Sequence, residues 1–193
     1  MRDINSVVDV FLALRERCMW LDSCYTTFSS LYESGDDRRK LLGSTAPGFF
    51  MEHNQVLQQH CILQACKLTD PAVMMGKKNL TLSHVNNMLR AANLLTPEIE
   101  ELSAKMASYR KLVLDSRHWI ISHHDLEATM LGEPVGAHEK EDWTVFLDSM
   151  YRYTDAVGEA VGVGPLNYRG CTGPGDANDL LKHLRNSINH PAN

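Results

Sequence analysis

The 193-residue sequence lacks any apolar run of the roughly 18 residues that a membrane-spanning helix requires. Its N-terminal segment is interrupted by charged residues and has no small-residue cleavage site, so it does not resemble a secretory signal peptide. Because neither feature is present, the sequence predicts a cytoplasmic protein with no membrane partner.

Paired cysteines and an excess of basic charge are also missing. The five cysteines are an odd number and include no C-x-x-C pair, so neither a disulfide framework nor a zinc ribbon is indicated. We expect reduced thiols, with Cys61 and Cys66 in the core. The net charge of −5 argues against an extended nucleic-acid surface and leaves room for a local basic patch.

Strand-like alternation is nearly absent, and the apolar residues recur at steps of three and four, which is the period of a helix. Residues 4–32 show this seam over four heptads and predict one long helix in a bundle or coiled coil. Residues 36–48 predict a loop, since they are polar and contain Gly and Pro. The seam consists of Ile4, Val7, Phe11, Leu14, Cys18, Leu21, Tyr25, Phe28 and Tyr32.

Further helices are expected at about 50–68, 82–94, from Thr96 to beyond 116, at about 140–161, and in a short segment capped by Asp176. The fold class is therefore all-α, a helical bundle of four to five main helices. We expect residues 1–163 to form the bundle. Residues 164–193 would add a Gly- and Pro-rich loop and a short C-terminal helix packed on the same domain.

The helix that begins after Thr96 ends in a polar cluster, "LDSRHWIISHHDLE", at residues 114–127. Its apolar seam ends on His123, and Arg117 and His124 are seven residues apart and share a face. An Arg can grip a phosphate with two hydrogen bonds, and a His can move protons at neutral pH. Such a pair can cleave RNA without metal, although its spacing recurs at Arg185 and His190 and is not decisive.

The segment "SRHWIISHHD" resembles the R-N-K-x-x-(A/S)-H-x-D motif of HEPN domains, an all-helical nucleotide-binding superfamily. Arg117, Ser122, His123 and Asp125 match the motif. The upstream "CKLTDPA" and "KKNLTLSHVNNML" resemble an abortive-infection branch of that superfamily. This resemblance covers about residues 50–126.

Two more histidines lie within the motif. His118 stands where the family has a polar Asn that commonly supports the site, and His124 falls on a variable position. The resemblance implies a catalytic pair of Arg117 and His123, with the remaining polar residues of the segment in supporting roles, and no cofactor. The supporting residues are Ser122, His124, Asp125 and His118.

The resemblance also implies partners and a biological role. Many members of the superfamily are dimeric, metal-independent ribonucleases of toxin–antitoxin or phage-defence systems, with Arg and His from two protomers facing each other. Others bind nucleotides or RNA without catalysis. We therefore expect a homodimer that acts on RNA, together with a cognate antitoxin or a nucleotidyltransferase-type protein as partner.

Other readings of the same residues remain open. A non-catalytic interaction module could use the seam of residues 4–32 to bind a partner. His118, His123, His124 and Asp125 could instead bind a metal ion, although no pair among them has the i, i+4 spacing of a helical site. Arg117 could form a salt bridge with Asp115, Glu127 or a neighbouring helix.

Overall fold

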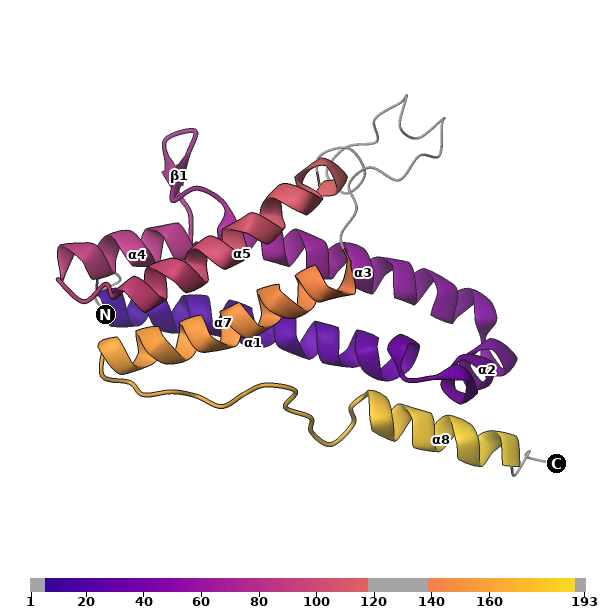
Figure 1. The fold of residues 1–193 in the computed structure, drawn as a ribbon. Coiled ribbons are helices and arrows are strands. Elements are labelled where there is room, and N and C mark those ends of the chain that lie inside the picture. The colour runs from indigo at the N-terminus through magenta and orange to yellow at the C-terminus, as the bar shows by residue number, and fades with distance from the viewer. Residues whose placement is uncertain (1–5, 118–138, 190–193) are drawn as a thin grey trace. The chain divides into compact units, whose positions relative to one another are not determined.

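The computed structural model describes residues 6–117 and 139–189, and these residues are all-α apart from one short hairpin (Figure 1). They contain seven α-helices, more than the four to five predicted. Four are long, at 20 to 23 residues each: α1 (Val7–Phe28), α3 (Pro47–Thr69), α5 (Pro97–Ser116) and α7 (Lys140–Ala160). The shorter elements are η1 (Ser29–Glu33, a π-helix), α2 (Asp36–Thr45), α4 (Leu82–Ala91) and α8 (Ala177–Asn189). In this part of the chain, no helix is long and apolar enough to cross a membrane.

Two predicted connections have structure. The prediction of a loop at residues 36–48 was wrong, because residues 36–45 form α2. Asp36 and Asp37 favour the helix N-terminus electrostatically, and burial of Leu42 supplies tertiary packing that a short helix needs. The segment after Asp70, expected to be a simple connection, forms an antiparallel hairpin of β1 (Val73–Met74) and β2 (Lys77–Lys78).

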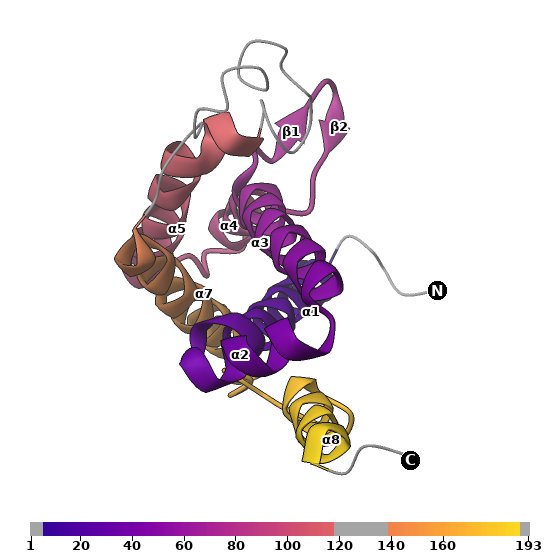
Figure 2. The same ribbon diagram turned by 90° about the vertical axis from the view of Figure 1, so that its right-hand side faces the viewer.

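The chain divides into two compact units. The first comprises residues 1–20 and 62–169 and contains α4, α5, α7 and the hairpin. The second comprises residues 21–61 and 170–193 and contains η1, α2 and α8. Figure 2 shows α5 and α7 side by side in the first unit. The predicted boundary at residues 163 and 164 remains a prediction.

The core of the first unit confirms the predicted helical period from Ile99 to Val113 of α5 and from Trp143 to Val157 of α7, whereas the predicted end of the α5 seam at His123 lies outside the described residues. Aromatic rings join the two helices, with Tyr109 centred 5.3 Å from Trp143 and 5.0 Å from Phe146. The Thr96 hydroxyl caps α5 as predicted, accepting a hydrogen bond from the Ile99 amide at 3.2 Å. The buried seam residues are Ile99, Leu102, Met106, Tyr109 and Val113 of α5, and Trp143, Phe146, Met150, Tyr153 and Val157 of α7.

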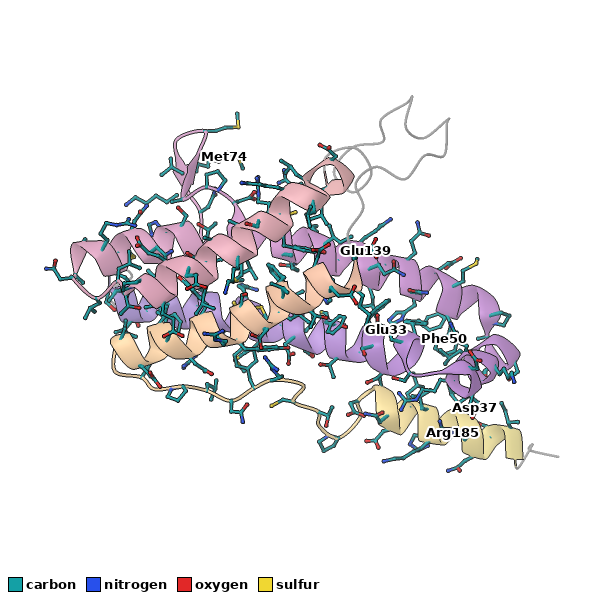
Figure 3. The ribbon with its side chains drawn as sticks, in the orientation of Figure 1. Glu33, Asp37, Phe50, Met74, Glu139 and Arg185 are labelled. Atoms are coloured by element: carbon teal, nitrogen blue, oxygen red, sulfur yellow. The ribbon has the colours of Figure 1, made fainter. Side chains whose placement is uncertain are left out.

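The second unit has its own small core, made of Leu31, Leu42, Phe50, Ala177 and Leu181. Figure 3 labels Phe50, the residue that α3 contributes. The Asp176 carboxylate caps α8 as predicted, accepting the Asn178 and Asp179 amides at 2.8 and 3.1 Å.

The first seam is confirmed only in its N-terminal part. Phe11, Leu14, Cys18 and Leu21 are fully buried. Further along, Leu31 is buried in the small core of the second unit, and the predicted Tyr32 is partly buried against the same core.

Candidate functional site

Helix α5 carries Arg117 at its C-terminal end. Pro97 occupies its first turn, where the missing amide hydrogen costs nothing, and regular helix continues to Ser116. Arg117 is the C-cap, and its backbone amide donates to the carbonyls of Val113 and Leu114. Of the six predicted site residues, only Arg117 lies within the described residues; His118, Ser122, His123, His124 and Asp125 lie outside them.

The structure pairs Arg117 with Asp70, the residue that follows α3. The distance between Arg117 Nη2 and Asp70 Oδ2 is 3.8 Å, longer than a hydrogen bond. A second arginine, Arg110, donates to Asp70 Oδ1 from Nη2 at 3.0 Å and from Nε at 3.3 Å. Arg110 and Arg117 are seven residues apart, so α5 presents both on one face. Arg117 therefore forms an ion pair with the residue that follows α3, which agrees with the alternative of a salt bridge to a neighbouring helix.

This cluster carries more positive than negative charge. Two guanidinium groups share one carboxylate, and within residues 6–117 and 139–189 no second carboxylate lies within ion-pair distance of either arginine. Arg117 Nε is buried and has no hydrogen-bond partner among those residues. The side chain of Asp70 is 9% exposed and that of Arg117 is 19% exposed, so water screens the excess charge only in part. Such an arrangement attracts an anion, and a phosphate fits the guanidinium geometry.

Cys66 lies close enough to the cluster to feel its charges. Burial raises the pKa of the Cys66 thiol, and the cations of Arg110 and Arg117 oppose that rise in part. The thiol is therefore protonated at neutral pH and is not an activated nucleophile. This agrees with the prediction that Cys66 is a core residue.

A polar cleft of about 230 Å³ lies between α4 and α5, and Thr69, the residue before Asp70, contributes to its wall. Beneath it, the buried Tyr153 hydroxyl donates to Asn86 Oδ1 at 2.8 Å, and Asn86 Nδ2 donates to Ser103 Oγ at 2.8 Å. This chain of bonds holds Asn86 in one orientation at the wall of the cleft. The lining residues are Thr69, Leu82, Ser83, Asn86, Asn87, Arg90, Ser103, Ala104 and Ala107.

Sequence reasoning missed Asp70 and Arg110 as members of the site. In the sequence, Asp70 stands out only as part of the "CKLTDPA" stretch of the family resemblance, and no charged partner is predicted for it. The spacing of Arg110 from Arg117 was the available signal, because two cations on one helix face need a counter-charge if they are half-buried.

Comparison with known families decides the classification. A family model described as AbiU2, of the HEPN type, matches residues 4–186. The chain belongs to the AbiU2 family of HEPN proteins. No curated protein and no solved structure matches it significantly.

The AbiU2 match confirms the resemblance found in the sequence and extends it. It includes the N-terminal helix and most of the C-terminal third, beyond residues 50–126. The protein is thus a HEPN-domain protein of abortive-infection type, with the all-α fold of that family.

Metal binding by this AbiU2 protein remains a separate prediction. The part of the chain that the structure describes holds no group of three or more His, Cys, Asp or Glu side chains that could bind a metal ion. The predicted metal ligands, His118, His123, His124 and Asp125, lie outside that part.

Proposed function

We propose that this AbiU2 protein is a metal-independent endoribonuclease that acts as a homodimer in toxin or phage-defence biology. The observation that carries the proposal is that, among the residues the structure describes, Arg110 and Arg117 share the single carboxylate of Asp70, which leaves Arg117 able to bind a phosphate. Membership of the HEPN family supports it, and so does the match of His123 to the family's catalytic histidine.

The proposed reaction is an intramolecular transesterification of the RNA phosphodiester. The 2′-oxygen attacks phosphorus, and the bond from phosphorus to the 5′-oxygen breaks, giving a 2′,3′-cyclic phosphate and a 5′-hydroxyl. His123 acts as the acid–base group: it accepts the proton of the 2′-hydroxyl and returns a proton to the leaving 5′-oxygen. Arg117 stabilises the charge that develops on the phosphoryl oxygens.

The remaining motif residues are proposed to support this pair. Continuation of the α5 period would place His124 on the face of Arg117, two turns further along. Ser122 and Asp125 match the family's small and acidic positions. His118 stands where the family has Asn, which favours a second candidate function: binding of RNA without cleavage.

Cleavage of RNA in the presence of EDTA tests the proposal. The wild-type protein is expected to cut, and His123→Ala is expected to be inactive while retaining its circular dichroism spectrum and melting temperature. His183→Ala, which removes an exposed histidine of α8, is the matched control and should cut normally. Full activity of His123→Ala would exclude the assignment, and RNA binding without cleavage by the wild type would favour the non-catalytic function.

The dimer is tested by complementation. Arg117→Gln and His123→Ala are each expected to be inactive alone. In a mixed dimer, the Arg117→Gln protomer supplies an intact His123 and the His123→Ala protomer supplies an intact Arg117. If the site is shared between protomers, co-expression of the two variants restores part of the activity. Mixed dimers that form and remain inactive would contradict a shared site.

The proposed toxin role also predicts a protein partner, either an antitoxin or a nucleotidyltransferase-type protein. Such a partner is expected to suppress cleavage when it is co-purified with the protein. Suppression should be absent with an unrelated acidic protein.

A further inference from the structure

The β1–β2 hairpin is attached directly to the site. It follows Asp70 after two residues, and its base is closed by Asn79, whose backbone amide donates to the Ala72 carbonyl at 2.8 Å. The Asn79 side chain also donates to the Pro71 carbonyl at 3.0 Å. Because Asp70 pairs with Arg117, the hairpin begins next to the residue that holds the proposed phosphate-binding arginine.

The hairpin lies in a segment with no acidic residue. From residue 71 to residue 97 the sequence contains Lys77, Lys78 and Arg90 but no Asp or Glu, in a chain whose net charge is −5. Arg90 pairs with Glu100 at 2.8 Å. Lys77 and Lys78 are exposed and form no ion pair with any residue that the structure describes. Two uncompensated cations therefore stand on the hairpin.

The tip of the hairpin places an exposed methionine in an unfavourable backbone conformation. Met75 has a φ of 50° and is 97% exposed, and Gly76 has a φ of 77°. Two positive φ angles at the centre of a two-residue turn match type I′, which strongly prefers Asn-Gly. A methionine there holds a strained backbone and leaves apolar surface in water, so neither turn geometry nor core packing accounts for it. Figure 3 shows the hairpin, marked by Met74, extending away from the neighbouring helices.

We infer that this hairpin is an RNA-contacting element beside the Arg117 site, an inference that rests on the proposed ribonuclease function. Lys77 and Lys78 bind backbone phosphates of the substrate, and Met75 packs its thioether against an unstacked base. An acidic protein repels RNA over most of its surface, so the substrate is held where the acid-free segment offers unpaired cations. The charge of the hairpin and its attachment to Asp70 both favour RNA as its ligand.

Counterion release gives the expected size of the effect. Each phosphate contact with single-stranded RNA contributes about 0.7 to the slope of log affinity against log salt concentration. Loss of two contacts should reduce that slope by about 1.4, which corresponds to roughly 25-fold weaker binding in 0.1 M salt. The difference should vanish as the salt concentration approaches 1 M.

The test measures binding of a fluorescein-labelled single-stranded RNA of mixed sequence by anisotropy over a salt series. The parent is His123→Ala, so that the RNA is not cut. The double variant Lys77→Gln, Lys78→Gln is expected to show the reduced slope. The control Lys40→Gln, Lys182→Gln removes the same charge from exposed positions of the other unit and should bind like the parent. Equal slopes for the hairpin variant and the parent, or an equal loss in the control, would overturn the inference.

Met75→Asn tests the tip separately. Asn-Gly suits the turn, so the melting temperature should not fall. Loss of a thioether contact with a base should weaken RNA binding about two- to tenfold with no change in the salt slope. Unchanged affinity would remove Met75 from the contact.

The same data separate this inference from the proposed catalysis. If the wild type cuts RNA and the hairpin variants bind like the parent, the hairpin inference is wrong and the ribonuclease stands. If the parent binds RNA through the hairpin and the wild type never cuts, the catalytic proposal fails and the hairpin contact stands.

Discussion

The two arginines that share Asp70 are expected to divide their roles, one stabilising the fold and the other acting on the substrate. Arg110 makes two hydrogen bonds to Asp70 Oδ1, at 3.0 and 3.3 Å, whereas Arg117 lies 3.8 Å from Oδ2. Arg110→Gln should therefore destabilise the protein, and Arg117→Gln should chiefly abolish activity.

The magnitudes follow from the contacts. Hydrogen bonds to a charged partner contribute about 1.5 to 3 kcal/mol, so we expect Arg110→Gln to lower the free energy of unfolding by about 2 to 3 kcal/mol. The Arg117 guanidinium lies outside hydrogen-bonding range of Asp70, which stays bonded to Arg110 in the variant, so loss of Arg117 should cost about 1 kcal/mol or less. For a chain of this length, each kcal/mol lowers the melting temperature by about 2 to 4 °C. The melting temperature should therefore fall by roughly 4 to 12 °C in Arg110→Gln and by no more than about 4 °C in Arg117→Gln.

The assay combines urea denaturation with RNA cleavage at a temperature where both variants are folded. Arg117→Gln should lose about 100-fold or more in cleavage rate, as expected when a charge-stabilising donor is removed. Arg110→Gln should still cut, since Arg117 is present. The reasoning is refuted if Arg117→Gln destabilises the protein as much as Arg110→Gln does and cleaves at the wild-type rate.

Three further changes test the packing of the first unit. Burial raises the pKa of the Cys18 thiol to about 12, so the thiol's contribution to stability is complete below pH 9 and is lost as the pH rises from 9 toward 12. The urea midpoint should fall over that pH range, and it should fall less steeply in Cys18→Ala. Gly158→Ala should lower the melting temperature, because the added Cβ would collide with a backbone carbonyl of the following loop, whereas Gly173→Ala, which has open space, should not. Asn86→Ala should cost about 1 to 3 kcal/mol in urea denaturation by leaving the buried Tyr153 hydroxyl without its acceptor, and a cost near zero would show that the bond is dispensable.

The long helices could be predicted from the sequence because burial imposes a period on it. The α5 and α7 seams step three and four residues, and their predicted positions from Ile99 to Val113 and from Trp143 to Val157 are buried. The caps of α5 and α8 could be predicted because a Thr or Asp side chain bonds to amides only two or three residues away.

The parts that escaped prediction depend on contacts between distant segments. Helix α2 is short, polar and rich in loop-type residues, and Leu42 is buried only because Leu31, Phe50 and Leu181 surround it. The pairing of Asp70 with Arg110 joins positions forty residues apart and leaves no periodic trace in the sequence. The hairpin lacks the usual Asn-Gly signal, since Met75 occupies the position that Asn favours.

The most direct test of the central claim is analysis of the ends of RNA incubated with the purified protein in EDTA. The RNA fragments are expected to end in 2′,3′-cyclic phosphate and to begin with 5′-hydroxyl. DNA of the same sequence should not be cut, and Arg117→Gln and His123→Ala should give no fragments. Cleavage that needs a divalent metal ion, or that leaves a 5′-phosphate, would contradict the proposed chemistry.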